Sequence, residues 1–208
     1  MNAAGIARDI VVIGASAGGV EALQALLAQL PRTLPAVVAV VIHRSPMFES
    51  RLPFVLGLRA HLPVMEPGDG DPVVPGRIYT APRDQHLVFE DGQLHLNRGP
   101  KEHRTRPAID PLFRSAAAAY GARVLGVLLT GLGDDGVPGF IDIKAAGGLT
   151  LVQDPAEARY PSMPRTAIAE DDVDGVLRLD DLAKAIAALG SGQPFGAPAR
   201  ESGQLSRS

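Results

Sequence analysis

Residues 10–30 have the sequence IVVIGASAGGVEALQALLAQL, which predicts a strand, a tight turn and a helix in succession. The apolar run Ile10–Ile13 is typical of a parallel strand that is buried on both faces. After the glycine-rich turn, apolar residues recur with helical spacing from Val20 to Leu30. Pro31 stops this helix, because proline cannot donate the backbone hydrogen bond of a helix interior. The stretch therefore predicts the first unit of an α/β fold.

The rest of the chain continues this alternation of strands and helices. Asp91-Gly92 lies between two alternating runs, which predicts a β-hairpin that adds antiparallel strands to the sheet. Together the elements predict an α/β fold with a doubly wound, mostly parallel sheet, helices on both faces and an antiparallel hairpin. Further strands are predicted at Ala36–Ile42, Arg77–Thr80, Arg123–Thr130, Leu149–Gln153 and Gly175–Leu179. Helices are predicted at Asp110–Tyr120, at Pro138–Ala146 and from an N-cap at Asp180 to Gly190.

Composition limits the classes of function. The chain has 208 residues, of which 46% are hydrophobic, so it can form a sizeable core. We expect residues 1–189 to form one domain and residues 190–208, which are rich in Gly, Ser and Pro, to form a disordered tail. The net charge of -3 and the 4% aromatic content argue against nucleic acid as a partner.

Other classes are excluded by what the sequence lacks. With no cysteine, the chain has no disulfide scaffold and no thiolate nucleophile. No apolar run is long enough for a signal peptide or for membrane insertion. We therefore expect a cytoplasmic protein.

Three candidate chemical groups follow predicted strands. Gly14–Gly18 matches G-x-S-x-G between a strand and a helix, a turn that exposes a serine nucleophile, here Ser16. His43 follows the second strand, and Asp134 and Asp135 lie in the glycine-rich loop after Arg123–Thr130. Because parallel strands present their carboxyl ends at one edge of a sheet, we expect these side chains to lie close together. Serine, imidazole and carboxylate in one place indicate acyl transfer.

Each motif also has a plainer interpretation. The serine turn could be an ordinary capped turn or a dinucleotide loop, although Ser16 occupies the position of the middle glycine in G-x-G-x-x-G. His43 could be a surface residue, and Asp134 and Asp135 could form a solvated turn or bind a cation. The order Ser, His, Asp also differs from the Ser, Asp, His order of standard α/β-hydrolases. The residues alone leave catalytic, structural and nucleotide-binding roles open.

Several segments, in order, resemble the catalytic domain of CheB, the chemotaxis protein-glutamate methylesterase. The resemblance spans roughly residues 9–189 and implies removal of methyl groups from glutamyl methyl esters on a methyl-accepting chemotaxis receptor, or on another methylated protein. It also implies deamidation of particular glutamines, and it implies neither a cofactor nor a metal. The matching segments are VVIGASAGGVEAL, VVIHRSPMFESRL, IYTAPRDQHL, RPAIDPLFRSAA, VLLTGLGDDG, AAGGLTLVQD and SMPRTAI.

The resemblance implies a role for each candidate residue. Ser16 is the nucleophile, His43 is the base and Asp135 is the orienting acid, since Asp134 occupies the variable position of GLGDDG. The backbone N–H of Leu132 is the family-like oxyanion donor, and the N–H of Ala17 is a second donor expected from the geometry of the turn. The remaining histidines are weaker candidates: His61, His86, His95 and His103.

The chain departs from the family pattern in several places. Ala17 stands where GASTGG has threonine, Leu132 where GMG has methionine, and Ala108 where R-P-S-V-D has serine. Typical members carry an N-terminal receiver domain, whereas the first predicted strand here begins at Ile10. We therefore expect no receiver and no control by phosphorylation in cis. The lost hydroxyls leave an alternative function, a catalytically weak domain that binds partner proteins as an adaptor in a chemosensory pathway.

Overall fold

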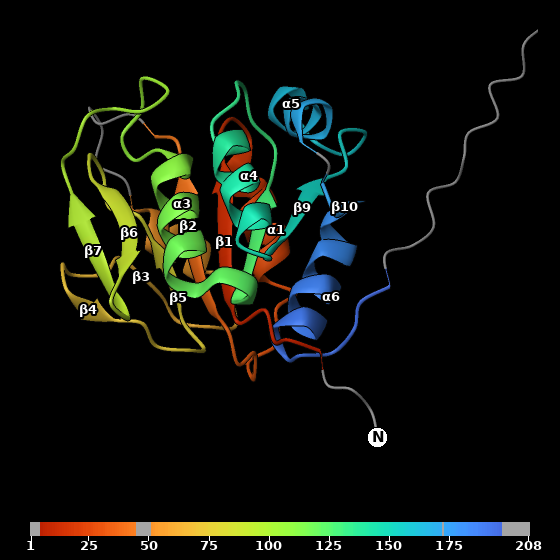
Figure 1. The fold of residues 1–208 in the computed structure, drawn as a ribbon, viewed down its shortest axis with the longest axis horizontal. Coiled ribbons are helices and arrows are strands. Elements are labelled where there is room, and N and C mark those ends of the chain that lie inside the picture. The colour runs from red at the N-terminus through yellow and green to blue at the C-terminus, as the bar shows by residue number, and fades with distance from the viewer. Residues whose placement is uncertain (1–4, 45–50, 172, 197–208) are drawn as a thin grey trace, which may run out of the picture.

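The computed structural model describes residues 5–44, 51–171 and 173–196. The strands of its main sheet are β1 (Ile10–Ala15), β2 (Val37–Ile42), β3 (Val64–Met65), β5 (Ile78–Thr80), β8 (Val124–Leu128), β9 (Leu149–Gln153) and β10 (Gly175–Leu177). They lie in the order β10-β9-β8-β1-β2-β5-β3, and every neighbouring pair is parallel (Figure 1).

The chain enters this sheet near its centre and winds in two directions. In the register of β1, Ile10 lies between Val37 of β2 and Val124 of β8. β2, β3 and β5 lie on one side of β1, whereas β8, β9 and β10, which come later in the chain, lie on the other. This reversal makes the sheet doubly wound, which confirms the predicted fold class. It also creates a switch point beside β1, where such sheets collect ligands and chemistry at the strand carboxyl ends.

Helices cover both faces of the sheet, and Figure 1 shows two of them, α3 and α4, in front of it. The helices are α1 (Gly19–Leu27), α2 (Leu52–Gly57), α3 (Ile109–Tyr120), α4 (Val137–Ala145), α5 (Ser162–Glu170) and α6 (Leu179–Gly190), with a short 3₁₀ turn η1 (Gly121–Arg123). Val11 and Ile13 of β1 face a core that they share with α1, α2 and α6. Ile10 and Val12 face a second core that they share with α3, α4 and α5. Burial on both faces explains the continuous apolar sequence of the central strands.

The remaining strands, β4 (Asp71–Pro72), β6 (His86–Glu90) and β7 (Gln93–Asn97), form a separate antiparallel sheet in the order β4-β7-β6. Asp91 and Gly92 connect β6 to β7 with φ values of 47° and 78°, as a type I′ turn requires. The predicted hairpin is therefore confirmed. The expectation that it extends the parallel sheet is wrong, because its apolar face packs against α3, where the rings of Phe89 and Tyr120 meet edge to face.

Two helices and one helix start differ from the prediction. The sequence patterns miss α2, which is short, and α5, which carries Pro164 in its first turn, where a proline is tolerated. The expectation that Asp180 is an N-cap is wrong, because α6 begins at Leu179 and Arg178 occupies the cap position. Asp180 lies in the first turn instead, where a carboxylate still faces the positive end of the helix.

The end of the chain is described only in part. Gly190 closes α6, and Phe195 packs against the core on the α6 side of the sheet. Residues 197–208 lie outside the described residues, so the disorder predicted for the tail stays a prediction.

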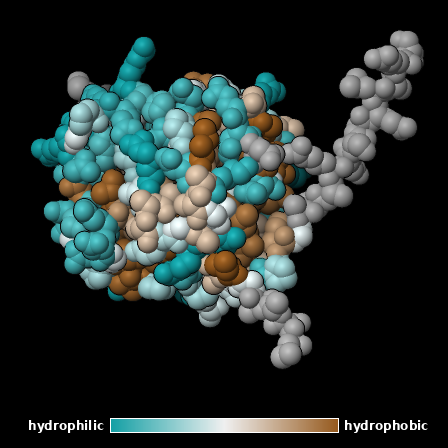
Figure 2. Space-filling model, in the orientation of Figure 1, coloured by the Kyte–Doolittle hydropathy of each residue, from teal (hydrophilic) through white to brown (hydrophobic). Residues whose placement is uncertain are grey.

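The helices and the surface bear on a membrane role. Among the described residues, no helix combines the length and apolar character needed to cross a membrane. Figure 2, which shows the face that carries α3 and α4, displays hydrophobic residues in separate areas among hydrophilic ones. The exposed large apolar residues include Phe54 of α2, Leu58 directly after α2 and Leu132 of the loop after β8.

Candidate active site

Ser16 lies in the tight turn between β1 and α1. Its backbone N–H donates to the Thr130 carbonyl at 3.0 Å, which ties the turn to the chain that leaves β8. Gly18 has a φ of 74°, a left-handed conformation that starts α1 and that side chains disfavour. A Cβ on Gly131 would lie 2.8 Å from the Ser16 Cβ, so only glycine allows the two loops to approach this closely. The local sequence thus fixes the serine at the edge of the sheet.

His43 follows β2 and faces this serine. Its backbone N–H donates to the Ala15 carbonyl at 3.1 Å, which extends the pairing of β1 and β2 by one residue. Its Nδ1 lies 3.1 Å from Ser16 Oγ, and its Nε2 lies 2.6 Å from Asp135 Oδ2. The imidazole therefore bridges the serine and the carboxylate.

Asp135 is almost completely buried, with 1% of its side chain exposed, and is held by the start of α3. Its Oδ2 accepts from the Ile109 N–H at 2.7 Å, and its Oδ1 accepts from the Asp110 N–H at 2.9 Å. Gly14 makes this approach possible, since a Cβ there would lie 2.6 Å from Ile109 Cγ2. Burial alone would raise the pKa of Asp135, but the hydrogen bonds from His43, Ile109 and Asp110 outweigh it and lower the pKa below its ordinary value.

These contacts fix the direction of each hydrogen bond. Because Asp135 is ionised, it accepts the proton of His43 Nε2. His43 Nδ1 then keeps its lone pair and can accept the Ser16 hydroxyl proton. The structure thus brings together the three side chains that the sequence predicts, in an arrangement suited to general-base activation of a serine.

The two predicted oxyanion donors come from the serine turn and from the loop after β8. Ala17 follows Ser16 directly, and Leu132 lies in the loop after β8 with 56% of its surface exposed. Among the described residues, no hydrogen bond engages the backbone N–H of Ala17 or of Leu132. Both amides are therefore available to a bound anion, and their role stays a prediction.

Thr130 organises this region, and the sequence patterns do not identify it. Its hydroxyl is buried and lies 3.1 Å from the Ala17 carbonyl, to which it can donate. The same hydroxyl accepts from the Tyr160 N–H at 2.8 Å, while the Thr130 N–H donates to Gln153 Oε1 at 2.8 Å. Thr130 thereby connects the serine turn to the chain that precedes α5.

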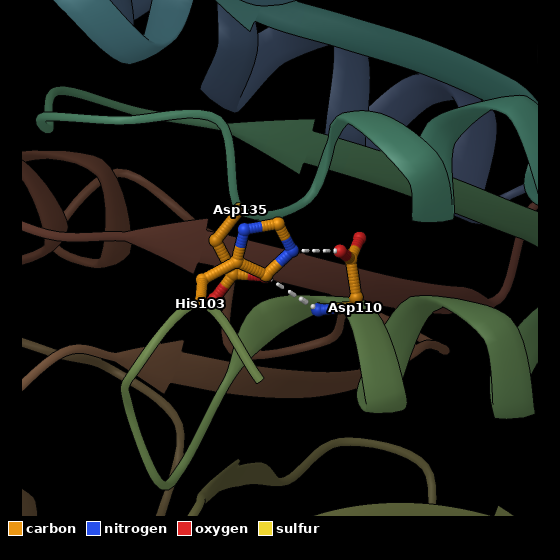
Figure 3. Close-up of side chains that lie close together, drawn as sticks. All are labelled: His103, Asp110 and Asp135. Atoms are coloured by element: carbon orange, nitrogen blue, oxygen red, sulfur yellow. Dashed lines mark hydrogen bonds and ion pairs between the residues drawn. The ribbon is translucent and has the colours of Figure 1, made fainter. Parts of the chain in front are cut away.

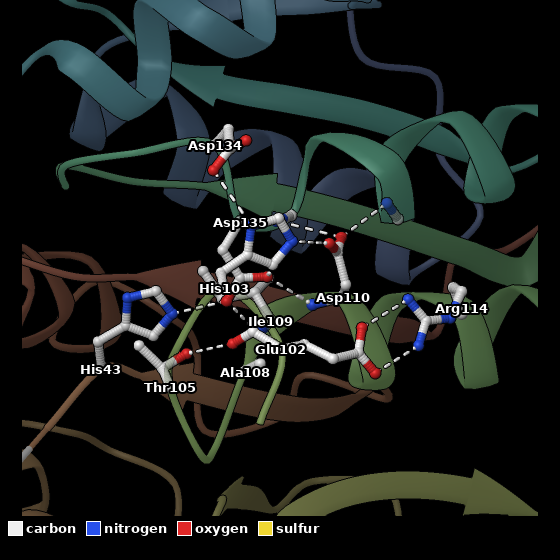
Figure 4. Close-up of polar contacts among 12 residues, drawn as sticks. His43, Glu102, His103, Thr105, Ala108, Ile109, Asp110, Arg114, Asp134 and Asp135 are labelled. Atoms are coloured by element: carbon white, nitrogen blue, oxygen red, sulfur yellow. Dashed lines mark hydrogen bonds and ion pairs between the residues drawn. The ribbon is translucent and has the colours of Figure 1, made fainter. Parts of the chain in front are cut away.

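A second histidine, His103, and a second aspartate, Asp110, lie next to Asp135 (Figure 4). His103 Nε2 lies 2.7 Å from Asp110 Oδ2 and 3.9 Å from Asp135 Oδ1. Its Nδ1 lies 3.1 Å from Asp134 Oδ1. The other oxygen of Asp110, Oδ1, accepts from two backbone N–H groups at the start of α4. Asp110 lies in the family-like segment RPAID, whereas no sequence signal distinguishes His103.

His103, Asp110 and Asp135 also have the spacing of a metal site, since one ligand atom from each lies within 4.8 Å of the others. All three side chains are already engaged by one another, by His43 or by backbone N–H groups. Metal binding would draw Asp135 away from His43. The contacts favour a hydrogen-bonded network over a metal centre.

Comparison with known proteins identifies the family. The family model described as CheB methylesterase matches residues 11–186. The chain belongs to the CheB methylesterase family. This confirms the resemblance carried by the sequence motifs.

Individual relatives agree with this assignment. The chain is 44% identical over 181 residues to protein-glutamate methylesterase/protein-glutamine glutaminase 2 of Anaeromyxobacter dehalogenans, covering 87% of this chain and 53% of that protein. It is 39% identical over 191 residues to protein-glutamate methylesterase/protein-glutamine glutaminase of Yersinia pestis, covering 89% of this chain and 54% of that protein. The chain thus spans about half the length of the curated relatives it matches.

The fold has a close counterpart among solved structures. The crystal structure of the Thermotoga maritima CheB methylesterase catalytic domain matches with a TM-score of 0.83 and 34% sequence identity. The match covers 87% of this chain and 98% of that domain. At this level of identity, the CheB catalytic-domain fold applies to nearly all of the described residues.

Proposed function

We propose that this CheB-family chain is a serine esterase that hydrolyses glutamyl methyl esters on a chemoreceptor, and that it also deamidates glutamines. The observation that carries the proposal is the continuous contact from Ser16 through His43 to Asp135, at 3.1 and 2.6 Å. Ser16 is half-buried at the carboxyl edge of the sheet, where the protein substrate is proposed to bind. The names of the relatives, methylesterase and glutaminase, support both reactions.

In the proposed reaction, His43 Nδ1 takes the Ser16 proton as Oγ attacks the ester carbonyl. The tetrahedral intermediate then expels methoxide, which takes the proton back from His43 and leaves as methanol. Water, deprotonated by His43, attacks the glutamyl-serine ester and releases glutamate and free Ser16. With a glutamine substrate the same steps release ammonia. Asp135 stabilises the imidazolium that forms in each step.

Two backbone amides are proposed to stabilise the oxyanion of each tetrahedral intermediate. Ala17 N–H lies next to the nucleophile, and Leu132 N–H lies in the loop beside it. Because the donors are amides, the replacement of methionine by leucine in GLG keeps the donor. Removal of one such donor costs about 10²-fold or more in kcat in enzymes of this type.

The proposed partner is a methyl-accepting chemoreceptor, and the proposed location is the cytoplasm. The test is methanol release from a methylated chemoreceptor cytoplasmic fragment, compared between the wild type and Ser16→Ala. We expect release by the wild type and none above background from the variant, because the variant lacks the hydroxyl that contacts His43 Nδ1.

Ser191→Ala is the matched control, since the hydroxyl of this exposed serine donates to the Ala187 carbonyl of α6, away from the site. Its release should equal that of the wild type. Equal release by wild type and Ser16→Ala would refute the assigned nucleophile. Absence of release from both would refute the chemoreceptor as substrate and direct the search to other methylated proteins.

A further inference from the structure

Two carboxylates lie buried side by side behind His43. The side chains of Asp110 and Asp135 are each 1% exposed. They are adjacent because the Asp110 N–H donates to Asp135 Oδ1 at 2.9 Å. Two negative charges at such a place repel one another, and the repulsion is strong where water is excluded. The site therefore needs a compensating positive charge.

His103 is placed to supply that charge (Figure 3). Each of its ring nitrogens faces a carboxylate oxygen, with Asp110 at Nε2 and Asp134 at Nδ1. A neutral imidazole has one donor and one acceptor, so two carboxylate partners require both nitrogens to donate. The geometry therefore favours the imidazolium, whose Nε2 lies 3.9 Å from Asp135 Oδ1.

Among the nearby basic groups that the structure describes, His103 is the one placed to offset the charge of Asp110. Arg114, which lies on α3 with Asp110, is engaged by both oxygens of Glu102, at 2.8 and 3.0 Å. Among the residues that the structure describes, His43 and His103 are the basic side chains within ion-pair distance of Asp110 or Asp135. The two imidazoles thus contact the same pair of buried carboxylates, His43 through Asp135 and His103 through Asp110.

Resting on the proposed function, we propose that His103 is a positioning residue that acts on His43 through Asp135. Its positive charge offsets part of the negative charge that Asp110 and Asp135 place behind His43. His43 therefore releases its proton at a lower pH than it would with His103 neutral. A base that is free near neutral pH is what the attack of Ser16 requires.

The charge balance of the group supports this role. Burial opposes the charged form of His103, but the hydrogen bond to Asp110 and the charge of Asp135 prevail and raise the pKa of His103. The pKa of Asp110 is also raised, by burial first and then by the charge of Asp135. A simple ion pair would lower the pKa of the acid. The hydrogen bonds from His103 and from the Gly139 N–H therefore only partly offset burial and the charge of Asp135 at Asp110.

The test reads the protonation of His43 directly. The chain is labelled with ¹⁵N-histidine, and the titration midpoint of His43 is measured by two-bond ¹H–¹⁵N NMR correlation. Removing the positive charge with His103→Gln should shift the midpoint about one pH unit upward, the size expected for a unit charge several ångströms away. Removing the negative charge with Asp110→Asn should shift it downward by about the same amount, and the double variant should lie near the wild type.

Opposite shifts are a result that loss of structure would not produce. His95→Gln is the matched control, because it removes a histidine–carboxylate pair with Asp69 on the small sheet. It should leave the His43 midpoint unchanged. His103 has a φ of 47°, so His103→Asn serves as a second variant, because asparagine tolerates this conformation.

Midpoints that stay unchanged in the His103 variants and in Asp110→Asn, or that move in the same direction, would overturn the proposal. The NMR titration needs no substrate, so it tests the role of His103 even if no methanol is released. For the active enzyme, the acid limb of the kcat/KM profile should shift with the His43 midpoint in each variant.

Discussion

Two histidine–aspartate pairs in this molecule differ in their surroundings. His43 and Asp135 lie 2.6 Å apart at the switch point of the main sheet, and the carboxylate is 1% exposed. His95 and Asp69 lie 3.1 Å apart on the small antiparallel sheet, and that carboxylate is 65% exposed. Both aspartates have lowered pKa values, Asp69 mainly through the Leu96 N–H and Asp135 against the effect of burial. The same two side chains can support catalysis only where water is excluded and backbone amides fix the carboxylate.

The largest expected effect separates the two pairs directly. Asp135→Asn keeps the size of the side chain but loses the charge that holds the His43 tautomer, so kcat for ester hydrolysis should fall by about 10⁴-fold. Asp69→Asn should change kcat less than twofold, because the exposed pair contacts neither Ser16 nor His43. Steady-state methanol release measures both. Equal losses would mean that Asp135 acts through folding and not through His43.

An intermediate effect is expected at Thr130, which belongs to the buried region. Thr130→Val removes the hydroxyl that contacts Ala17 and Tyr160 and leaves their backbone groups without this partner. We expect a loss of about 1–3 kcal/mol in the free energy of unfolding. We also expect a fall in kcat, because the turn that carries Ser16 loses an anchor.

Urea denaturation of Thr130→Val gives the change in stability, and methanol release gives the change in rate. Thr166→Val is the control, because the Thr166 hydroxyl bonds to the Ser162 carbonyl on an exposed part of α5. It should change stability by less than about 0.5 kcal/mol, as is usual for surface substitutions. An equally small change in Thr130→Val would show that the buried hydroxyl does not anchor the serine turn.

The smallest expected effect concerns stability in acid. The pKa of Asp135 is lowered in the folded state, so its contribution to stability is present above the pKa of the unfolded chain, near 4. That contribution is lost as the pH falls through the lowered value. Between pH 5 and pH 2, Asp135→Asn should therefore lose less stability than the wild type, as measured by thermal melting. A steeper acid loss in the variant would contradict this sign.

The sequence predicts much of the fold and the central contacts of the site. Continuous apolar runs identify β1, β2 and β8, and the rule that parallel strands present their carboxyl ends together places Ser16, His43 and Asp135 at one edge. The strands follow from the local hydrophobic pattern, and the position of the three side chains follows from the parallel topology of the sheet. The hairpin is also predicted correctly, because its turn depends on local residues. Its packing against α3 depends on tertiary contacts, which the hairpin sequence alone does not predict.

The rest of the site depends on contacts between residues that have no shared pattern. His103 lies in a loop without periodicity, and its partners Asp110 and Asp134 come from two other segments. Thr130 is one of several threonines, and only the packing of the loops around it gives its hydroxyl three backbone neighbours. Such networks are specified by tertiary structure, so neither residue can be predicted from spacing alone.

The strand order has a consequence for the time at which activity can arise. β1 pairs directly with β8, although the whole small sheet and α3 lie between them in the chain. During synthesis, Ser16 and His43 are made early. The third residue, Asp135, is made much later, because it follows β8. Closing so long a stretch of chain is entropically costly and comes late in folding. In the proposed mechanism, a growing or incompletely folded chain therefore carries a Ser16 and a His43 that lack their orienting carboxylate, and full hydrolytic activity requires the centre of the sheet to be complete.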